Sequence, residues 1–144
     1  MSVFAENRKA YFDYEILEKF EAGLVLSGAE VKSIKNGRMN LSGSYVNFHS
    51  GEPYIIGASI APYQPKNQPP DYDPSRTRKL LLNKKEIDYL LGKTKQKGLT
   101  LMPLRVYNKG RKIKIDIGLA RGKKQYVKRS VISKREAERK IERE

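Results

Sequence analysis

Hydrophobic and polar residues alternate most regularly over residues 112–119. Four apolar residues occupy every second position there, namely Ile113, Ile115, Ile117 and Leu119, and the positions between them hold Lys112, Lys114, Asp116 and Gly118. A period of two puts the apolar side chains on one face, which predicts a half-buried strand that ends at Leu119. Shorter stretches predict further strands at residues 12–16, 23–26, 45–48, 54–60, 76–82 and 99–107.

Two helices are predicted by their start sequences. Ser27 and Glu30 form a capping box, in which each side chain can bond the other residue's amide, and the helix should run to Asn36 with Gly37 after it. Asn83 offers a second cap, and Ile87, Leu90 and Leu91 share one face of the helix that follows and ends at Gly98.

Short strands with turn residues between them, and few helices, favour a mainly β fold with flanking helices, either a small closed antiparallel barrel or a sandwich. Residues 62–75 hold five of the seven prolines and predict an exposed, mobile loop. The alternation stops after Ala120. We therefore expect a folded domain over residues 1–120 and a basic tail over 121–144 that is disordered when free and partly helical when bound.

The charge is large and uneven. The 144 residues include 30 Lys and Arg against 16 Asp and Glu, a net charge of +14. Residues 1–26 hold 3 basic and 5 acidic residues, whereas residues 121–144 hold 10 basic and 4 acidic ones. Such an excess indicates a polyanionic partner, nucleic acid before an anionic membrane.

The chain lacks the residues that several common catalytic and metal-binding sites require. The chain has no Cys and a single His, His49, which excludes thiolate catalysis and paired-His metal sites. Asp71 and Asp73 lie in the proline-rich segment, and no glycine-rich phosphate loop occurs. We therefore expect a binding protein without a cofactor rather than an enzyme. No leader or membrane-spanning stretch is evident, and we expect a cytoplasmic protein.

Two groups of cations are candidates for phosphate binding. Arg76, Arg78 and Lys79 lie at the start of a predicted strand, and guanidinium groups match phosphate oxygens. In the tail, two pairs of cations flank Tyr126, whose ring could stack on a base. The alternatives are a solvated strand edge for the first group and a solubilising tail for the second.

Four short sequence motifs resemble those of the bacterial SsrA-binding protein (SmpB) family: FEAGL at 20–24, GAEVKSI at 28–34, RTRKLLLN at 76–83 and GKKQY at 122–126. The resemblance covers about residues 7–136. It implies a barrel of the oligonucleotide-binding type and a role in trans-translation. The protein would bind the tRNA-like domain of transfer-messenger RNA (tmRNA) and carry it to stalled ribosomes. Its tail would enter the small-subunit decoding centre and the empty mRNA channel. Elongation factor Tu and alanyl-tRNA synthetase would be indirect partners, through tmRNA.

The resemblance also assigns residues. Glu21, Leu81 and Asn83 match positions implicated in tmRNA binding, and the tail has Val127 where the family usually has Asp. With the charged neighbours, the candidate RNA-binding residues are Glu21, Lys32, Arg76, Arg78, Lys79, Leu81, Asn83 and Lys84. The candidate ribosome-binding residues are Lys123, Lys124, Tyr126, Lys128, Arg129, Lys134 and Arg135. A permanent ribosomal protein that binds rRNA is the alternative function.

Overall fold

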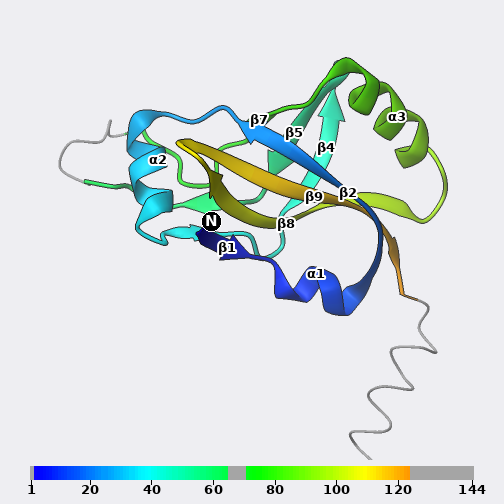
Figure 1. Ribbon diagram of the computed structural model, residues 1–144, viewed down its shortest axis with the longest axis horizontal. Coiled ribbons are helices and arrows are strands. Elements are labelled where there is room, and N and C mark those ends of the chain that lie inside the picture. The colour runs from blue at the N-terminus through cyan, green and yellow to red at the C-terminus, as the bar shows by residue number, and fades with distance from the viewer. Residues whose placement is uncertain (1, 65–70, 124–144) are drawn as a thin grey trace, which may run out of the picture.

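Six strands close into an antiparallel barrel in the computed structural model, which describes residues 2–64 and 71–123. They are hydrogen-bonded in the order β8, β4, β5, β7, β2, β9 and back to β8. Their bounds are β2 Tyr14–Leu24, β4 Tyr45–His49, β5 Glu52–Ile56, β7 Arg78–Leu81, β8 Leu99–Lys109 and β9 Lys112–Gly122. β1 (Val3–Glu6) pairs with β8, and β3 (Met39–Asn40) pairs with β6 (Ser59–Ile60) outside the barrel. The predicted closed barrel is confirmed (Figure 1).

Apolar side chains from alternate strand positions fill the barrel. The four residues of the period-two pattern in β9 are all at most 9% exposed, as predicted. They belong to one core with residues of the other strands and of two helices: Val46, Ile55, Leu80, Leu101, Ile34 and Leu90. Burial of such a side chain stabilises the fold by roughly 1.5–3 kcal/mol each, so this core accounts for the closed shape.

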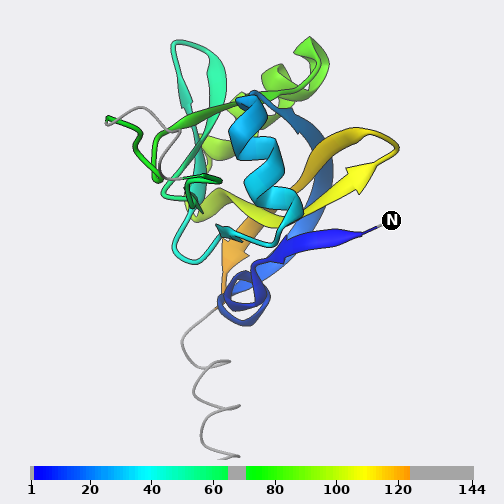
Figure 2. The ribbon, with the colours of Figure 1, turned by 90° about the vertical axis from the view of Figure 1, so that its left-hand side faces the viewer.

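Both predicted helix caps are present. Helix α2 (Gly28–Lys35) begins after Ser27, whose hydroxyl accepts from the Glu30 amide at 3.2 Å. Helix α3 (Lys84–Thr94) begins after Asn83, which accepts from the Glu86 amide at 2.8 Å. α3 ends four residues before Gly98, which instead lies in the turn before β8. Figure 2 shows α2 in front of the barrel and α3 on its far side.

The N-terminal region differs from the prediction. Residues Arg8–Asp13 form helix α1, where a strand over 12–16 was expected. Asn7 starts this helix by accepting from the Ala10 amide, and its own amide group donates to the Pro103 carbonyl oxygen at 3.0 Å. The strand begins only at Tyr14 and continues to Leu24, so the two short predicted strands are parts of one long strand. β1 was not predicted.

Other expected boundaries also moved. The strand expected over 54–60 is interrupted at Gly57, whose φ of +85° turns the chain, so that β6 can pair with β3 instead. β9 continues past Leu119 to Gly122 because Tyr14 and Glu15 of β2 pair with its last residues. The proline-rich segment is anchored at its described end, where the Tyr72 hydroxyl donates to the Ile60 carbonyl oxygen at 2.9 Å.

Candidate nucleic-acid interface

An exposed leucine lines a groove between β2, β7 and the start of β9, which we call the Leu81 groove. Leu81, the last residue of β7, is 53% exposed and is paired with Gly23 of β2. A Cβ atom at Gly23 would lie 3.3 Å from the Leu81 Cβ, so glycine leaves the room that Leu81 occupies. The groove measures about 360 Å³, and its remaining lining residues are Leu24, Leu26, Val31, Arg111, Lys112, Ile113 and Lys114. An apolar floor beside three cations suits a nucleobase with its phosphates.

The cations lie in the turn between β8 and β9 and on the strand positions next to it. We call Lys109, Arg111, Lys112 and Lys114 the cationic hairpin. Lys112 and Lys114 are the polar positions of the period-two pattern described above, and strand pairing sets Lys109 opposite Lys112 and Tyr107 opposite Lys114. These four residues were not among the predicted site residues. The alternation in β9 contained the information, since it predicts that Lys112 and Lys114 point away from the core.

Glu21 lies beside the cationic hairpin in a chain of side-chain contacts across β2, β8 and β9. Its carboxylate accepts from Lys109 Nζ at 3.1 Å and from the Tyr107 hydroxyl. The Tyr107 hydroxyl also lies 2.8 Å from Asp116 Oδ1, and Asp116 Oδ2 accepts from Arg105 Nε at 2.8 Å. We call Lys109, Glu21, Tyr107, Asp116 and Arg105 the Glu21 network. It shows that Glu21 of β2 bonds two side chains of β8, and that Tyr107 extends these contacts to β9.

The Glu21 network shifts the pKa values of Glu21 and Tyr107. The hydrogen bond from Tyr107, followed by that from Lys109, lowers the pKa of Glu21. Tyr107 is 3% exposed, and burial together with the two carboxylates raises its pKa. Glu21 is therefore a carboxylate, and Tyr107 a neutral phenol, at neutral pH.

Arg78 was predicted to contact RNA, but the structure places its side chain in the interior. Its side chain is 0% exposed and binds Glu30 of α2, with Nη2 at 2.7 Å and Nε at 2.8 Å from Oε2. It also donates to the carbonyl oxygens of Ala58, Arg76 and Pro74, at 3.0, 3.0 and 2.9 Å, and to the Tyr72 hydroxyl at 3.4 Å. A guanidinium so enclosed cannot reach an external phosphate, so the expected RNA contact is wrong for Arg78. Arg76 also binds Glu30 but remains 39% exposed.

Glu30 is the shared acceptor of this buried cluster. Burial opposes its ionisation, but hydrogen bonds from Arg76, the Ser27 amide and Arg78 outweigh that effect and lower its pKa to about 2. Glu30 thus serves both the cap of α2 and the link from α2 to β7. The link fixes the strand that carries Leu81.

The other predicted residues of the folded part lie at the surface. Lys79 pairs with Glu52 at 3.1 Å, and both side chains are over 40% exposed. Lys32 on α2 lies 5.6 Å from the Tyr63 ring centroid. Asn83 and Lys84 are exposed at the start of α3, two and three residues after Leu81. Lys79, Asn83 and Lys84 therefore adjoin Leu81 in sequence, Lys79 on the same strand, whereas Lys32 lies on α2.

Lys123 lies at the opposite end of β2 from Glu21. Its amide donates to the Asp13 carbonyl oxygen, and its Nζ donates to the Tyr11 carbonyl oxygen, both at 3.1 Å. Tyr14 pairs with Gly122, just before Lys123, while Glu21 lies seven positions along the same strand, which is at most about 23 Å of strand at 3.3 Å per residue. The other tail candidates fall outside the described residues: Lys124, Tyr126, Lys128, Arg129, Lys134 and Arg135.

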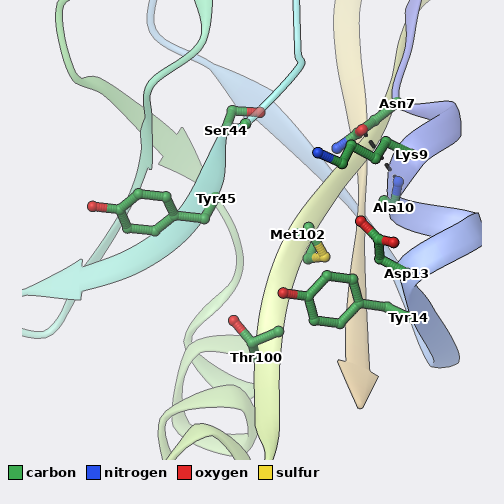
Figure 3. A pocket seen from close by; sticks show the side chains of 10 residues that line it. Asn7, Lys9, Ala10, Asp13, Tyr14, Ser44, Tyr45, Thr100 and Met102 are labelled. Atoms are coloured by element: carbon green, nitrogen blue, oxygen red, sulfur yellow. Dashed lines mark hydrogen bonds between the residues drawn. The ribbon is translucent and has the colours of Figure 1, made fainter. Parts of the chain in front are cut away.

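A second cavity, of about 370 Å³, lies near the point where β9 ends. Tyr14 and Tyr45 stand on either side of it, with Met102 of β8 between them (Figure 3). Lys9 and Asp13 of α1 complete its polar rim. His49, the last residue of β4, is not among the residues that line this cavity. Its ring lies 6.4 Å from that of Tyr54. Over residues 2–64 and 71–123, no cluster of three or more His, Asp and Glu side chains could hold a metal ion.

The comparisons with known proteins identify the family. The family model described as SmpB protein matches residues 4–144. The chain belongs to the SmpB family. It is 53% identical to the SsrA-binding protein of Carboxydothermus hydrogenoformans over 97% of this chain and 93% of that protein. It is 51% identical to the SsrA-binding protein of Chloroflexus aggregans over 99% and 90% of the two chains.

The fold of the SmpB family is shared as well. A chain in a solved structure described as "tmRNA-SmpB: a journey to the center of the bacterial ribosome" superposes with a TM-score of 0.68. It is 52% identical, over 83% of this chain and 84% of that one. None of the helices in the described segments is long and apolar enough to cross a membrane.

Proposed function

We propose that this protein is an RNA-binding adaptor of trans-translation. It binds the tRNA-like domain of tmRNA and delivers it to stalled ribosomes. The observation that carries the proposal is membership of the SmpB family over residues 4–144, with relatives about half identical that are named SsrA-binding protein. The Leu81 groove and the cationic hairpin supply the apolar and positive surfaces that folded RNA requires.

The two ends of β2 support a division of labour. We infer that the end with Glu21 and Leu81 takes tmRNA, together with exposed Arg76, Lys79, Asn83 and Lys84, while Lys32 contributes from α2. The end with Lys123 starts the basic tail, which enters the decoding centre and the empty mRNA channel. Residues 1–120 and 121–144 therefore have separate tasks. A channel already filled by mRNA would exclude the tail sterically.

The remaining partners follow from the RNA. Elongation factor Tu and alanyl-tRNA synthetase act on the tRNA-like end of tmRNA, and so meet this protein indirectly. We place the protein in the cytoplasm, where these partners work. It catalyses no step itself.

Sequencing the RNA that co-purifies with the protein from cells tests this proposal. We expect tmRNA to be strongly enriched over its cellular share, and a Leu81→Ala/Glu21→Gln variant to lose that enrichment. Enrichment of ribosomal RNA alone would contradict the proposal and favour a structural ribosomal protein. A salt wash separates the two further, because an adaptor leaves the ribosome whereas a structural protein stays.

A further inference from the structure

The Tyr107 hydroxyl faces two carboxylates with a single proton. Asp116 Oδ1 lies 2.8 Å away on one side and Glu21 accepts on the other. One hydroxyl hydrogen serves one acceptor well at a time, so both carboxylates depend on further donors. Lys109 supplies the donor for Glu21 at 3.1 Å, and Arg105 supplies the one for Asp116 at 2.8 Å. The Glu21 network therefore ends in a cation on each side.

Lys109 is held whereas the rest of the cationic hairpin is not. Its side chain is 66% exposed, so its ammonium faces solvent while Glu21 anchors it. Within the described part of the chain, Arg111, Lys112 and Lys114 form no ion pair. These three cations, beside one oriented cation, form a strip of positive charge next to the Leu81 groove, and the charge of Lys114 also lowers the pKa of Glu21.

Glu21 itself is badly suited to touch the RNA backbone. Its charge repels phosphate, and both of its oxygens already accept hydrogen bonds from protein donors. Its described contacts instead restrict a long, flexible lysine, which loses fewer rotamers on binding when it is already positioned. A carboxylate that orients a cation strengthens phosphate recognition without contacting the ligand.

We propose that Glu21 is a positioning residue, which together with Tyr107 fixes Lys109 so that the cationic hairpin binds consecutive phosphates of the RNA backbone. Lys109 is then the residue that touches RNA. This inference rests on the proposed function, since the RNA in question is the tRNA-like domain of tmRNA. In this view Glu21 affects RNA binding only through the Lys109 ammonium that it positions.

A double-mutant cycle on the full chain tests this assignment. Affinity for the tRNA-like domain is measured from low to high salt for wild type, Lys109→Gln, Glu21→Gln and the double variant. We expect Lys109→Gln to weaken binding several-fold and to reduce the steepness of log affinity against log salt by roughly 0.7–0.9, one phosphate contact. Glu21→Gln should weaken binding several-fold in wild type but less than about two-fold when Lys109 is already changed.

Lys97→Gln is the matched control, because it removes the same charge just before the opposite end of β8. It should leave the affinity and the salt dependence unchanged. Tyr107→Phe keeps the ring and removes the hydroxyl, and should show the same dependence on Lys109 as Glu21→Gln. Tyr107→Phe can replace Glu21→Gln in the cycle if Glu21→Gln does not fold. Melting curves of each variant will show whether it folds.

Two results would overturn the inference. An unchanged salt dependence for Lys109→Gln would show that Lys109 binds no phosphate. An equal loss from Glu21→Gln with and without Lys109 would show that Glu21 acts on the RNA by another route. Failure of the wild-type protein to bind this RNA is a different outcome, since it would refute the proposed function itself.

Discussion

Arg78 carries a full charge into the interior, and Glu30 makes this possible. Both side chains are at most 1% exposed, and the guanidinium is enclosed by the carboxylate, by three carbonyl oxygens and by the Tyr72 hydroxyl. Breaking such a pair is costly because the partner left behind remains charged and buried. At the scale of single residues, this cluster is structural, whereas Glu21 and Leu81 lie at the surface, where we propose that they serve RNA binding.

Glu30→Gln should therefore destabilise the protein strongly. It removes the charge that balances Arg78 and weakens the cap of α2, and we expect a loss of about 3–5 kcal/mol in the free energy of unfolding. Urea denaturation measures it. Glu52→Gln is the control, because its pair with Lys79 is exposed and should cost less than about 1 kcal/mol. Similar losses in the two variants would contradict this account.

The same carboxylate predicts an acid-sensitive fold. The pKa of Glu30 is lowered from 4.5 to about 2. A lowered pKa means that the stabilisation is present above pH 4.5 and is lost as the pH falls through about 2, and the difference corresponds to roughly 3 kcal/mol. Unfolding free energies measured between pH 5 and pH 2 should fall accordingly. Glu30→Gln should flatten this part of the profile, and an unaltered slope would refute the assignment.

Gly23 should be sensitive to a single methyl group. Alanine there would place its Cβ 3.3 Å from that of Leu81 and push Leu81 away from its position over the groove. We expect Gly23→Ala to lower affinity for the tRNA-like domain several-fold while the melting temperature changes little. Gly92→Ala is the control, since its Cβ would meet open space on α3. Equal RNA binding by both variants would mean that the position of Leu81 is unimportant.

At the scale of elements, local features were predictable and distant pairings were not. The caps of α2 and α3 and the burial pattern of β9 depend on neighbours within a few positions, and the sequence was enough to predict them. The fate of Arg78 depends on Glu30, 48 positions away, and no periodicity in a charged strand start reveals such a partner. The helix α1 was missed because Phe12, Tyr14 and Ile16 fit a strand pattern locally.

Asn83 caps helix α3 and lies two residues after Leu81, so it can serve both the helix and the proposed RNA interface. Asn83→Ala should cost about 1 kcal/mol of stability through the lost cap. Asn83→Ser keeps a capping oxygen but removes the amide, so it should restore the melting temperature. If Asn83 also contacts RNA, both variants will bind more weakly. Normal binding by Asn83→Ser, with weak binding by Asn83→Ala alone, would reduce Asn83 to a cap.

At the scale of the whole molecule, we propose that the barrel recognises RNA and that the tail acts on the ribosome. The folded part extends beyond the boundary expected at Ala120, since β9 runs to Gly122 and Lys123 contacts α1. A cut after Ala120 would remove residues paired with Tyr14 and Glu15. Truncation after Lys123 is therefore the cleaner way to remove the tail.

The most direct test compares the full chain with the chain truncated after Lys123 in two assays, binding to the tRNA-like domain of tmRNA and peptide tagging on stalled ribosomes. We expect the truncated protein to bind this RNA within a few-fold of the full chain and to lose nearly all tagging. Lys128→Ala/Arg129→Ala should resemble the truncation in both assays. Normal tagging without the tail, or loss of specific RNA binding on its removal, would contradict the account.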